Sequence, residues 1–233
     1  MNTLEETKIK LLAIDCLQSM KQQKTFRKLS RELSLPAGVL NRYINGYVLP
    51  KTDRAETLIN FFIKNYLPKI LEASKTKKSK YFVTAHILSQ PFLLNVIAFR
   101  ATKSLESKIN VVFTAASDGI PIAQAIANLI GAKFIYAKLT QEFTFSDHYA
   151  SKSSGEKPIS TPFYLPKSLL KRNDDVLIVD DVIRAGTTFE ALTSICDQAK
   201  ANISGIFALF IISSAYRELK KKHKVNYLVL AKD

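Results

Sequence analysis

The sequence is poor in cysteine and has no long apolar run. Its two cysteines, Cys16 and Cys196, lie among apolar residues with no second ligand nearby, which predicts buried thiols in a reducing compartment. No apolar run approaches the roughly 18 residues of a membrane-spanning helix. The first residues, MNTLEETKIKLL, carry acids and lack the apolar core of a signal peptide. We therefore expect a cytoplasmic protein without a membrane partner.

The few histidines and the lack of mixed basic and aromatic stretches disfavour metal-binding and RNA-binding functions. The three histidines, His86, His148 and His223, are scattered, and none has metal-ligand spacing, so we expect no metal site built by the chain alone. The chain has no internal repeats. Basic and aromatic residues are not interleaved as in an RNA-binding surface, so RNA binding is the least favoured interpretation.

Acidic residues are outnumbered by basic ones, and the excess is unevenly distributed. The net charge is +14, and residues 1–80 hold 16 Lys and Arg against 7 Asp and Glu, a net of +9. A balance this basic indicates a polyanionic partner, which could be nucleic acid, a membrane surface or a phosphorylated ligand. The alternative is a lysine-rich protein whose basic face is simply solvated.

The stretch SKTKKSK (74–80) divides the chain into two differently patterned parts. Helical periodicity dominates before it, whereas strand-like and helix-like runs alternate after it. We therefore expect an all-α domain over 1–74, a linker over 75–80, and an α/β domain over 81–233 with a mostly parallel five-stranded sheet. The strand-like runs are 109–116, 132–139, 176–181, 203–213 and 226–231.

The first part contains two short helical segments joined by a three-residue break. TFRKLSREL (25–33) and AGVLNRYING (37–46) flank SLP, which is the spacing of a helix-turn-helix. The second helix would present small residues that allow close approach to a DNA groove, with Asn and Arg side chains that can pair with base edges. Basic residues nearby would meet phosphates. The expected DNA-contacting residues are Arg27, Lys28, Ala37, Gly38, Asn41, Arg42, Asn45 and Lys51.

This segment resembles a known family of DNA readers. KLSRELSLPAGVLNRYINGYVLP is similar to the helix-turn-helix of the lambda-repressor/Cro type, and the likeness covers about 30 residues. Ser30 and Ser34 stand where alanine and glycine are more usual, but both are small enough for the turn. The alternative interpretation is a helical cap or dimerisation domain.

The segment VLIVDDVIRAGTT (176–188) joins a buried strand, two carboxylates and a hydroxyl-rich turn. Carboxylates at the carboxyl end of a parallel strand lie where open α/β sheets bind ligands. Backbone amides at the start of the following helix would surround an anion. Asp180 and Asp181 could therefore accept hydrogen bonds from ribose hydroxyls. The expected 5′-phosphate loop comprises Arg184, Ala185, Gly186, Thr187 and Thr188.

The segment resembles the signature with which type I phosphoribosyltransferases bind phosphoribosyl pyrophosphate (PRPP). The resemblance covers 81–233 and implies a parallel sheet beneath a small hood, with Asp180 and Asp181 on the ribose, the loop 184–188 on the 5′-phosphate, and Mg²⁺ entering with PRPP. TAASDGIPIA (114–123) is similar to the family's pyrophosphate loop, and 140–162 to its flexible covering loop. The implied pyrophosphate-loop residues are Ala116, Ser117, Asp118 and Gly119.

Two residues depart from the enzymes of that family. Arg184 stands where a small or hydroxyl residue is common, and a basic residue followed by Ala185 resembles instead the purine repressors of Gram-positive bacteria. Asp118 would repel a pyrophosphate group unless Mg²⁺ bridged the two. These departures weaken the expectation of catalytic turnover, and we assign no catalytic residue. Asp118 also leaves open a ligand without pyrophosphate, such as a nucleoside monophosphate.

The two parts together predict a transcriptional regulator of nucleotide metabolism, purine metabolism in particular. A helix-turn-helix joined to a phosphoribosyltransferase-like domain resembles the archaeal regulators of that two-domain type. We expect double-stranded DNA and PRPP or a nucleotide as partners, and a homodimer that spaces two recognition helices. The alternative is an active purine or pyrimidine phosphoribosyltransferase that uses PRPP, with the first helices as a hood or dimer domain.

Overall fold

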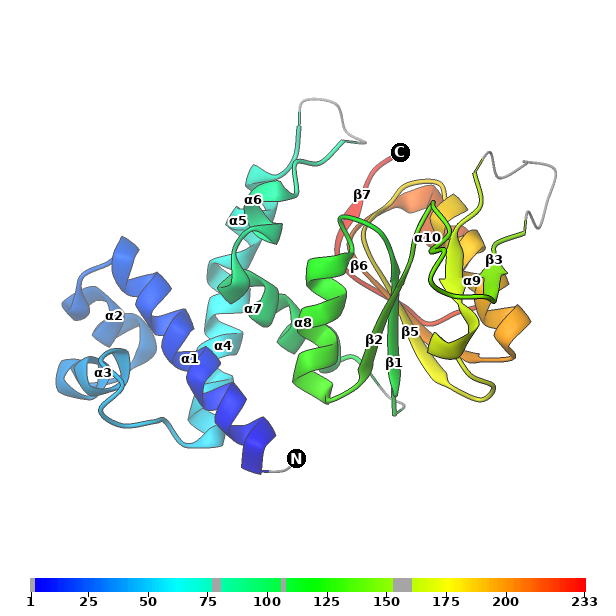
Figure 1. Cartoon of the computed structure of the whole chain (residues 1–233). Coiled ribbons are helices and arrows are strands. Elements are labelled where there is room, and N and C mark those ends of the chain that lie inside the picture. The colour runs from blue at the N-terminus through cyan, green and yellow to red at the C-terminus, as the bar shows by residue number, and fades with distance from the viewer. Residues whose placement is uncertain (1–2, 77–80, 106–107, 153–160) are drawn as a thin grey trace. The chain divides into compact units, whose positions relative to one another are not determined.

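The computed structural model describes residues 3–76, 81–105, 108–152 and 161–233 (Figure 1). They divide into two compact units, each described by itself below. The first unit comprises Met1–Ala73 and Gln90–Val96, and the second comprises Ser74–Ser89 and Ile97–Asp233. Residues 77–80 of the expected linker lie outside the described residues.

The first unit is helical, as its periodicity predicts. It contains α1 (Thr3–Gln23), α2 (Phe26–Leu33), α3 (Ala37–Ile44), α4 (Thr52–Asn65), α5 (Leu67–Ala73) and the start of α7 (Pro91–Thr102). Apolar residues recurring at helical spacing meet in one core, whose buried members include Leu12, Leu17, Met20, Leu29, Leu40, Ile59 and Phe62. Phe62 stacks on Tyr66 with ring centroids 5.4 Å apart. This packing holds the short helices α2 and α3 in place.

The turn between α2 and α3 is built from local polar contacts. The Thr25 hydroxyl accepts a hydrogen bond from the Lys28 amide at 3.3 Å and so caps the start of α2. Ser34 ends that helix in the left-handed conformation, with φ 51°. The Ser30 hydroxyl donates to the Leu35 carbonyl at 2.6 Å, across the turn. The chain then enters α3 directly after Pro36.

The second unit contains the expected parallel five-stranded sheet, in the order β2-β1-β5-β6-β7. The strands are β1 (Val111–Ala115), β2 (Lys133–Ala137), β5 (Asp175–Ile183), β6 (Asn202–Ile212) and β7 (Val225–Ala231), and every neighbouring pair is parallel. β1 is buried along its whole length and β6 from Gly205 onward, which is typical of a sheet covered on both faces.

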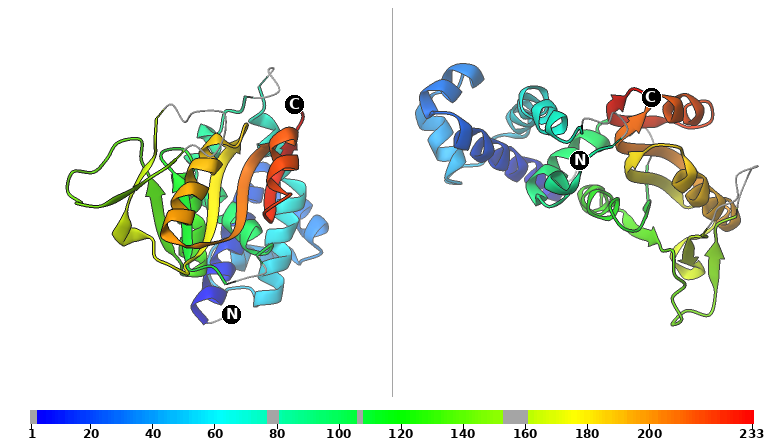
Figure 2. Two further views of the ribbon diagram at one scale, coloured as in Figure 1. Left: turned by 90° about the vertical axis from the view of Figure 1, so that its right-hand side faces the viewer. Right: turned by 90° about the horizontal axis from the view of Figure 1, so that it is seen from above.

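Helices cover the two faces of this sheet. α8 (Ile120–Ile130) connects β1 to β2, whereas α9 (Thr187–Ala199) and α10 (Ser213–Leu219) connect strands in the opposite direction along the sheet. Right-handed crossovers therefore place α8 on one face and α9 and α10 on the other, as Figure 2 shows. The unit also contains the short helix α6 (Ala85–Leu88) and a 3-10 helix, η1 (Lys167–Leu169).

One pair of strands was not expected from the sequence. β3 (His148–Ala150) and β4 (Tyr164–Pro166) form a separate antiparallel sheet. β3 lies within the long polar loop expected over 140–162, and β4 begins just after it. Three-residue strands give too short a pattern to recognise, and their pairing joins residues 14 to 18 positions apart, from Ala150↔Tyr164 to His148↔Pro166. Residues 153–160 of that loop lie outside the described residues.

Candidate functional site

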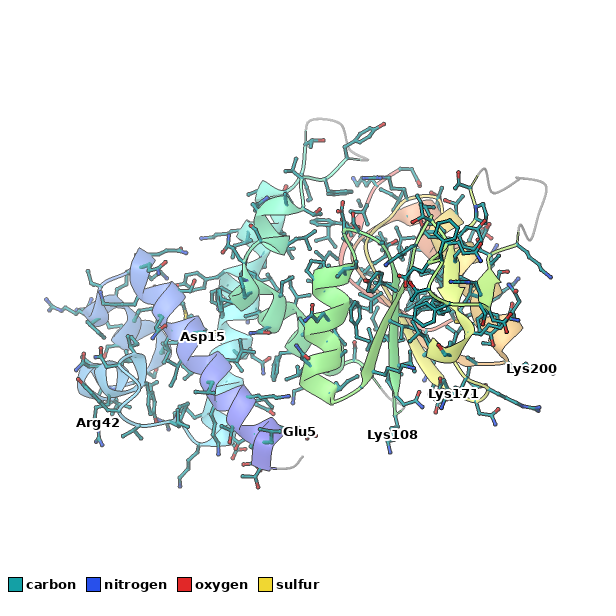
Figure 3. All side chains as sticks on the ribbon, in the orientation of Figure 1. Glu5, Asp15, Arg42, Lys108, Lys171 and Lys200 are labelled. Atoms are coloured by element: carbon teal, nitrogen blue, oxygen red, sulfur yellow. The ribbon has the colours of Figure 1, made fainter. Side chains whose placement is uncertain are left out.

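Two expected anion-binding loops leave the same edge of the sheet. β1 ends at Ala115 and is followed by residues 116–119, and β5 ends at Ile183 and is followed by residues 184–186. Because β1 and β5 are parallel neighbours, both loops emerge at the carboxyl edge, where open α/β sheets bind ligands. Figure 3 labels Lys108, Lys171 and Lys200, which precede β1, β5 and β6 and lie at the opposite edge.

The acid pair lies inside β5, which is a correction to the expected strand end at residue 181. Val182 and Ile183 remain in the strand because they pair with Phe210 and Ile211 of β6. Asp180 is partly buried, and its Oδ1 accepts a hydrogen bond from the Asp181 amide at 2.9 Å. Burial, and after it the neighbouring Asp181 carboxylate, raise the pKa of Asp180 to about 8.

Asp181 has a donor on each carboxylate oxygen. Its Oδ1 accepts from the Val182 amide at 2.8 Å, and its Oδ2 accepts from the Thr84 hydroxyl at 3.0 Å. Thr84 is buried, with 8% of its surface exposed, and it is 97 positions away in the chain. The sequence analysis missed Thr84, because an isolated threonine outside any motif gives no signal.

The expected phosphate loop after β5 leads directly into α9. Gly186 adopts the left-handed conformation, with φ 77°, immediately before the first turn of α9. Arg184, Ala185 and Thr187 are exposed, and Thr188 is partly exposed. The first amides of this 13-residue helix have no carbonyl partner within the helix, and they lie beside hydroxyl groups and a guanidinium. The Arg184 guanidinium lies 5.7 Å from the centre of the Tyr81 ring.

The loop after β1 is closely packed on its inner side and open on its outer side. Gly119 is buried, whereas Ser117 and Asp118 are exposed and Ala116 is partly exposed. The Ser117 hydroxyl donates to Asp118 Oδ1 at 3.1 Å. The Ala116–Ser117 peptide bond is cis. The Asp118 carboxylate is therefore presented to solvent at the carboxyl edge of the sheet.

Two hollows in the second unit are lined by residues other than the acid pair. One of about 470 Å³ borders the 184–186 loop and α10, and Glu190 and Glu218 contribute acidic groups to its wall. Another of about 210 Å³ lies between β2 and the β3–β4 pair. Its lining is largely aromatic and includes Phe134, Tyr136, Phe145, His148 and Tyr164.

In the first unit, the expected base-reading residues share an exposed surface of α3. Ala37, Gly38, Asn41, Arg42 and Asn45 are all exposed, whereas Leu40 on the other side of the helix is fully buried. The Asn45 amide donates to Asn41 Oδ1 at 3.0 Å, which joins the two side chains. Figure 3 labels Arg42 on this helix. We refer to these five residues as the α3 face.

Basic residues flank the α3 face. Arg27 and Lys28 on α2 are exposed, as is Lys51 just before α4. Lys24 differs from them, because its amino group forms a 2.5 Å ion pair with Glu32 and lies 5.0 Å from the centre of the Tyr66 ring. Lys24 was also expected to meet phosphates, and its ion pair with Glu32 sets it apart from the exposed Arg27, Lys28 and Lys51.

Neither cysteine belongs to a site. Cys16 and Cys196 are free and buried, and burial raises the pKa of Cys196 to about 12. Among the residues that the structure describes, no group of three or more His, Cys, Asp and Glu side chains could hold a metal ion. None of the described helices combines the length and apolar character needed to cross a membrane.

Comparison with known proteins identifies some relatives that are named as transcriptional regulators and others that are named as enzymes. The chain is 30% identical over 172 residues to the probable purine biosynthesis transcriptional regulator PurR of Streptococcus pneumoniae serotype 4, covering 72% of this chain and 61% of that protein. It is 34% identical over 106 residues to xanthine phosphoribosyltransferase of Finegoldia magna, covering 45% of this chain and 56% of that protein. The chain thus spans about three fifths of each relative's length.

The fold has close counterparts among solved structures. Adenine phosphoribosyltransferase from Rhodothermus marinus superposes with a TM-score of 0.61 at 19% sequence identity, covering 70% of this chain and 97% of that one. Residues 84–231 match the phosphoribosyl transferase domain family, which includes β1 through β7 and both loops at the carboxyl edge. The chain therefore belongs to the phosphoribosyl transferase domain family.

Proposed function

We propose that this protein is a DNA-binding transcriptional regulator of purine metabolism, and that its phosphoribosyltransferase domain binds PRPP or a nucleotide as an effector. The observation that carries the proposal is the presence in one chain of a polar, cation-flanked α3 face and of an acid pair beside a phosphate-type loop. Similarity to the Streptococcus pneumoniae relative, which is named as a probable purine biosynthesis transcriptional regulator, supports the same function.

The effector site would use the two loops and the acid pair in distinct roles. Asp180 and Asp181 would accept hydrogen bonds from ribose hydroxyls, which is chemistry suited to adjacent carboxylates. The amides of 185–188 and the Arg184 side chain would hold the 5′-phosphate, since a helix N-terminus and a guanidinium both favour that anion. Residues 116–119 would face the pyrophosphate group.

Mg²⁺ would enter with PRPP, because the described carboxylates form no metal-holding group of their own. The exposed Asp118 carboxylate at the carboxyl edge of the sheet could offer this cation one hard oxygen donor, as it prefers. When bound with PRPP, Mg²⁺ would offset the repulsion between Asp118 and the pyrophosphate. A nucleoside monophosphate lacks that group and would need no such ion.

The first unit would read double-stranded DNA through a helix-turn-helix formed by α2 and α3. Asn41, Arg42 and Asn45 would contact base edges, while Ala37 and Gly38 would allow the helix to approach the groove closely. Arg27, Lys28 and Lys51 would neutralise phosphates, which makes binding sensitive to salt. One short helix has a small interface, so a homodimer that presents two α3 faces to two half-sites completes the proposal.

An active purine phosphoribosyltransferase is the second candidate. It is favoured by the retention of both loops and the acid pair, and by the likeness to the Finegoldia magna enzyme. Asp118 and Arg184 disfavour it, because they differ from the residues common in the enzymes. The two candidates differ in their dependence on the α3 face, which an enzyme would not need.

A binding titration separates the two candidates. The full chain would be titrated against DNA from upstream of its own gene, with and without PRPP and Mg²⁺, in the presence of competitor DNA. We expect specific binding whose affinity changes with PRPP. Specific binding whose affinity does not change with PRPP would keep the regulator and make a purine nucleotide the proposed effector instead of PRPP. Absence of specific binding, together with release of pyrophosphate from PRPP and a purine base, would refute the regulator and support the enzyme.

A further inference from the structure

The segment that follows α5 folds back on itself in the second unit. We call residues 74–76 and 81–84 the connector. Lys75 and Phe82 form an antiparallel bridge, and the Val83 amide donates to the Ser74 carbonyl at 2.8 Å. The Thr76 hydroxyl donates to the Tyr81 carbonyl at 2.9 Å. These bonds join the two sides of the connector to each other.

The connector touches the candidate effector site at two charged groups. The Thr84 hydroxyl donates to Asp181 Oδ2 at 3.0 Å, and the Tyr81 ring lies 5.7 Å from the Arg184 guanidinium. A third contact is apolar: Phe82 stacks on Phe210 of β6, with ring centroids 4.2 Å apart. The polar contacts therefore involve one residue of the acid pair and one of the phosphate-type loop.

Among the described residues, the Thr84 hydroxyl donates its hydrogen bond to Asp181 alone. Thr84 precedes α6, but its side chain makes no capping hydrogen bond to that helix. It is buried, and its hydroxyl donates to the one oxygen of Asp181 that does not accept from the Val182 amide. The Thr84 hydroxyl thus occupies the position from which a hydroxyl of a bound sugar would donate to Asp181 Oδ2.

We propose that Thr84 is a positioning residue that a ligand hydroxyl displaces from Asp181, so that effector binding releases the connector. The proposal rests on the proposed function, because it takes the effector to be a ribose phosphate. A sugar hydroxyl that donates to Asp181 Oδ2 replaces the Thr84 hydroxyl. A phosphate on the loop forms charge-assisted hydrogen bonds to Arg184, which are stronger than its contact with the Tyr81 ring.

Release of the connector would reach the first unit through the chain itself. Ser74 follows directly on Ala73, the last residue of α5, so the connector is covalently continuous with the helical unit. A ligand shifts an equilibrium between two states only if it binds one of them more tightly. Here the two states differ in whether the connector keeps its contacts with Asp181 and Arg184. Coupling is reciprocal, so DNA that favours one state of the connector must alter effector affinity by the same factor.

Thr84→Val tests the displacement, because valine keeps the shape of threonine and removes the hydroxyl. PRPP with Mg²⁺ is titrated calorimetrically into the wild type, Thr84→Val and Thr84→Ser. We expect Thr84→Val to bind PRPP roughly fivefold more tightly, the worth of one competing hydrogen bond, and Thr84→Ser to match the wild type. Hydrogen exchange of residues 81–88 should be faster in Thr84→Val, and in the wild type only when PRPP is present.

The outcomes separate this inference from the function on which it rests. A wild type that binds PRPP, combined with unchanged or weaker binding by Thr84→Val, refutes the displacement and leaves the effector site intact. Unchanged hydrogen exchange in Thr84→Val refutes the restraint on the connector, whether or not a ligand binds. A wild type that binds neither PRPP nor AMP nor GMP refutes the effector site itself. Thermal unfolding of each variant verifies that it is folded.

Discussion

Gly119 lies against the side chain of Thr114, so that a Cβ atom added at Gly119 would stand 2.2 Å from Thr114 Oγ1. Thr114 is fully buried in β1 and cannot move aside. We expect Gly119→Ala to cost about 1–3 kcal/mol of stability, as overpacked sites do, and to displace the 116–119 loop. Denaturant unfolding and PRPP titration would measure the two effects.

The double variant Gly119→Ala/Thr114→Ala serves as the control for that prediction. Removing Oγ1 leaves the added methyl group 3.4 Å from the Thr114 Cβ and 3.4 Å from the Val179 carbonyl, which is tight but tolerable. PRPP binding should therefore recover in the double variant relative to Gly119→Ala. Failure to recover would show that the glycine is needed for a reason other than this contact.

Gly38→Ala tests whether the α3 face approaches DNA closely. An added Cβ at Gly38 would meet no atom within 4 Å in the free protein, and the residue is inside α3. Alanine should stabilise the helix by about 0.5–1 kcal/mol. DNA affinity should nevertheless fall, because the methyl group would occupy the space between helix and groove. Unchanged or tighter DNA binding would remove Gly38 from the interface.

Ser34→Gly should stabilise the first unit. Ser34 adopts φ 51° at the end of α2, a conformation that costs a residue with a Cβ roughly 1–2 kcal/mol. Part of that gain is offset by the greater freedom of glycine in the unfolded chain, so we expect a net gain of about 0.5–1 kcal/mol. Ser34→Ala is the matched control and should bring no gain, since alanine keeps the Cβ. Chemical denaturation of the three proteins decides the matter.

Stability should fall as pH rises toward the pKa of Asp180. That pKa is raised to about 8, by burial first and by Asp181 second. A carboxyl group whose pKa is raised by folding stabilises the fold below its unfolded value of about 4, and this contribution is lost as the pH rises through the folded value. In the absence of ligand and Mg²⁺, the free energy of unfolding should therefore decline across this window.

Asp180→Asn should abolish most of that decline, because the amide mimics the protonated acid without titrating. His223 contributes with the opposite sign, since burial lowers its pKa and the fold gains stability as that histidine loses its proton. The difference between variant and wild type cancels the histidine and isolates Asp180. Parallel urea-unfolding profiles in the two proteins would contradict the raised pKa.

Arg42→Ala should weaken specific DNA binding by about 1–3 kcal/mol, which is the worth of one good base contact. Arg42 is exposed on α3, so its loss should leave stability unchanged. Lys171→Ala removes the same charge from the opposite edge of the sheet in the second unit and is the matched control. Fluorescence anisotropy on operator and competitor DNA would compare them. Equal losses in both variants would indicate a general charge effect.

The local pattern of residues was sufficient to predict the elements. The five expected strand ranges overlap β1, β2, β5, β6 and β7, because residues buried on both faces of a parallel strand form continuous apolar runs. The expected break at residues 34–36 coincides with the turn between α2 and α3. The sequence pattern assigned no element to residues 85–102, where the structure has α6 and α7.

By itself, the sequence determined the strand-loop-helix units and the acid pair with its phosphate-type loop, since these depend on neighbours a few residues apart. Only the tertiary structure decided that Thr84 meets Asp181, that Tyr81 meets Arg184, and that Gln90–Val96 joins the first unit. These contacts join residues about one hundred positions apart or parts of the chain with no pattern of their own. They follow from the order of strands in the sheet and from side-chain packing, which local periodicity does not encode.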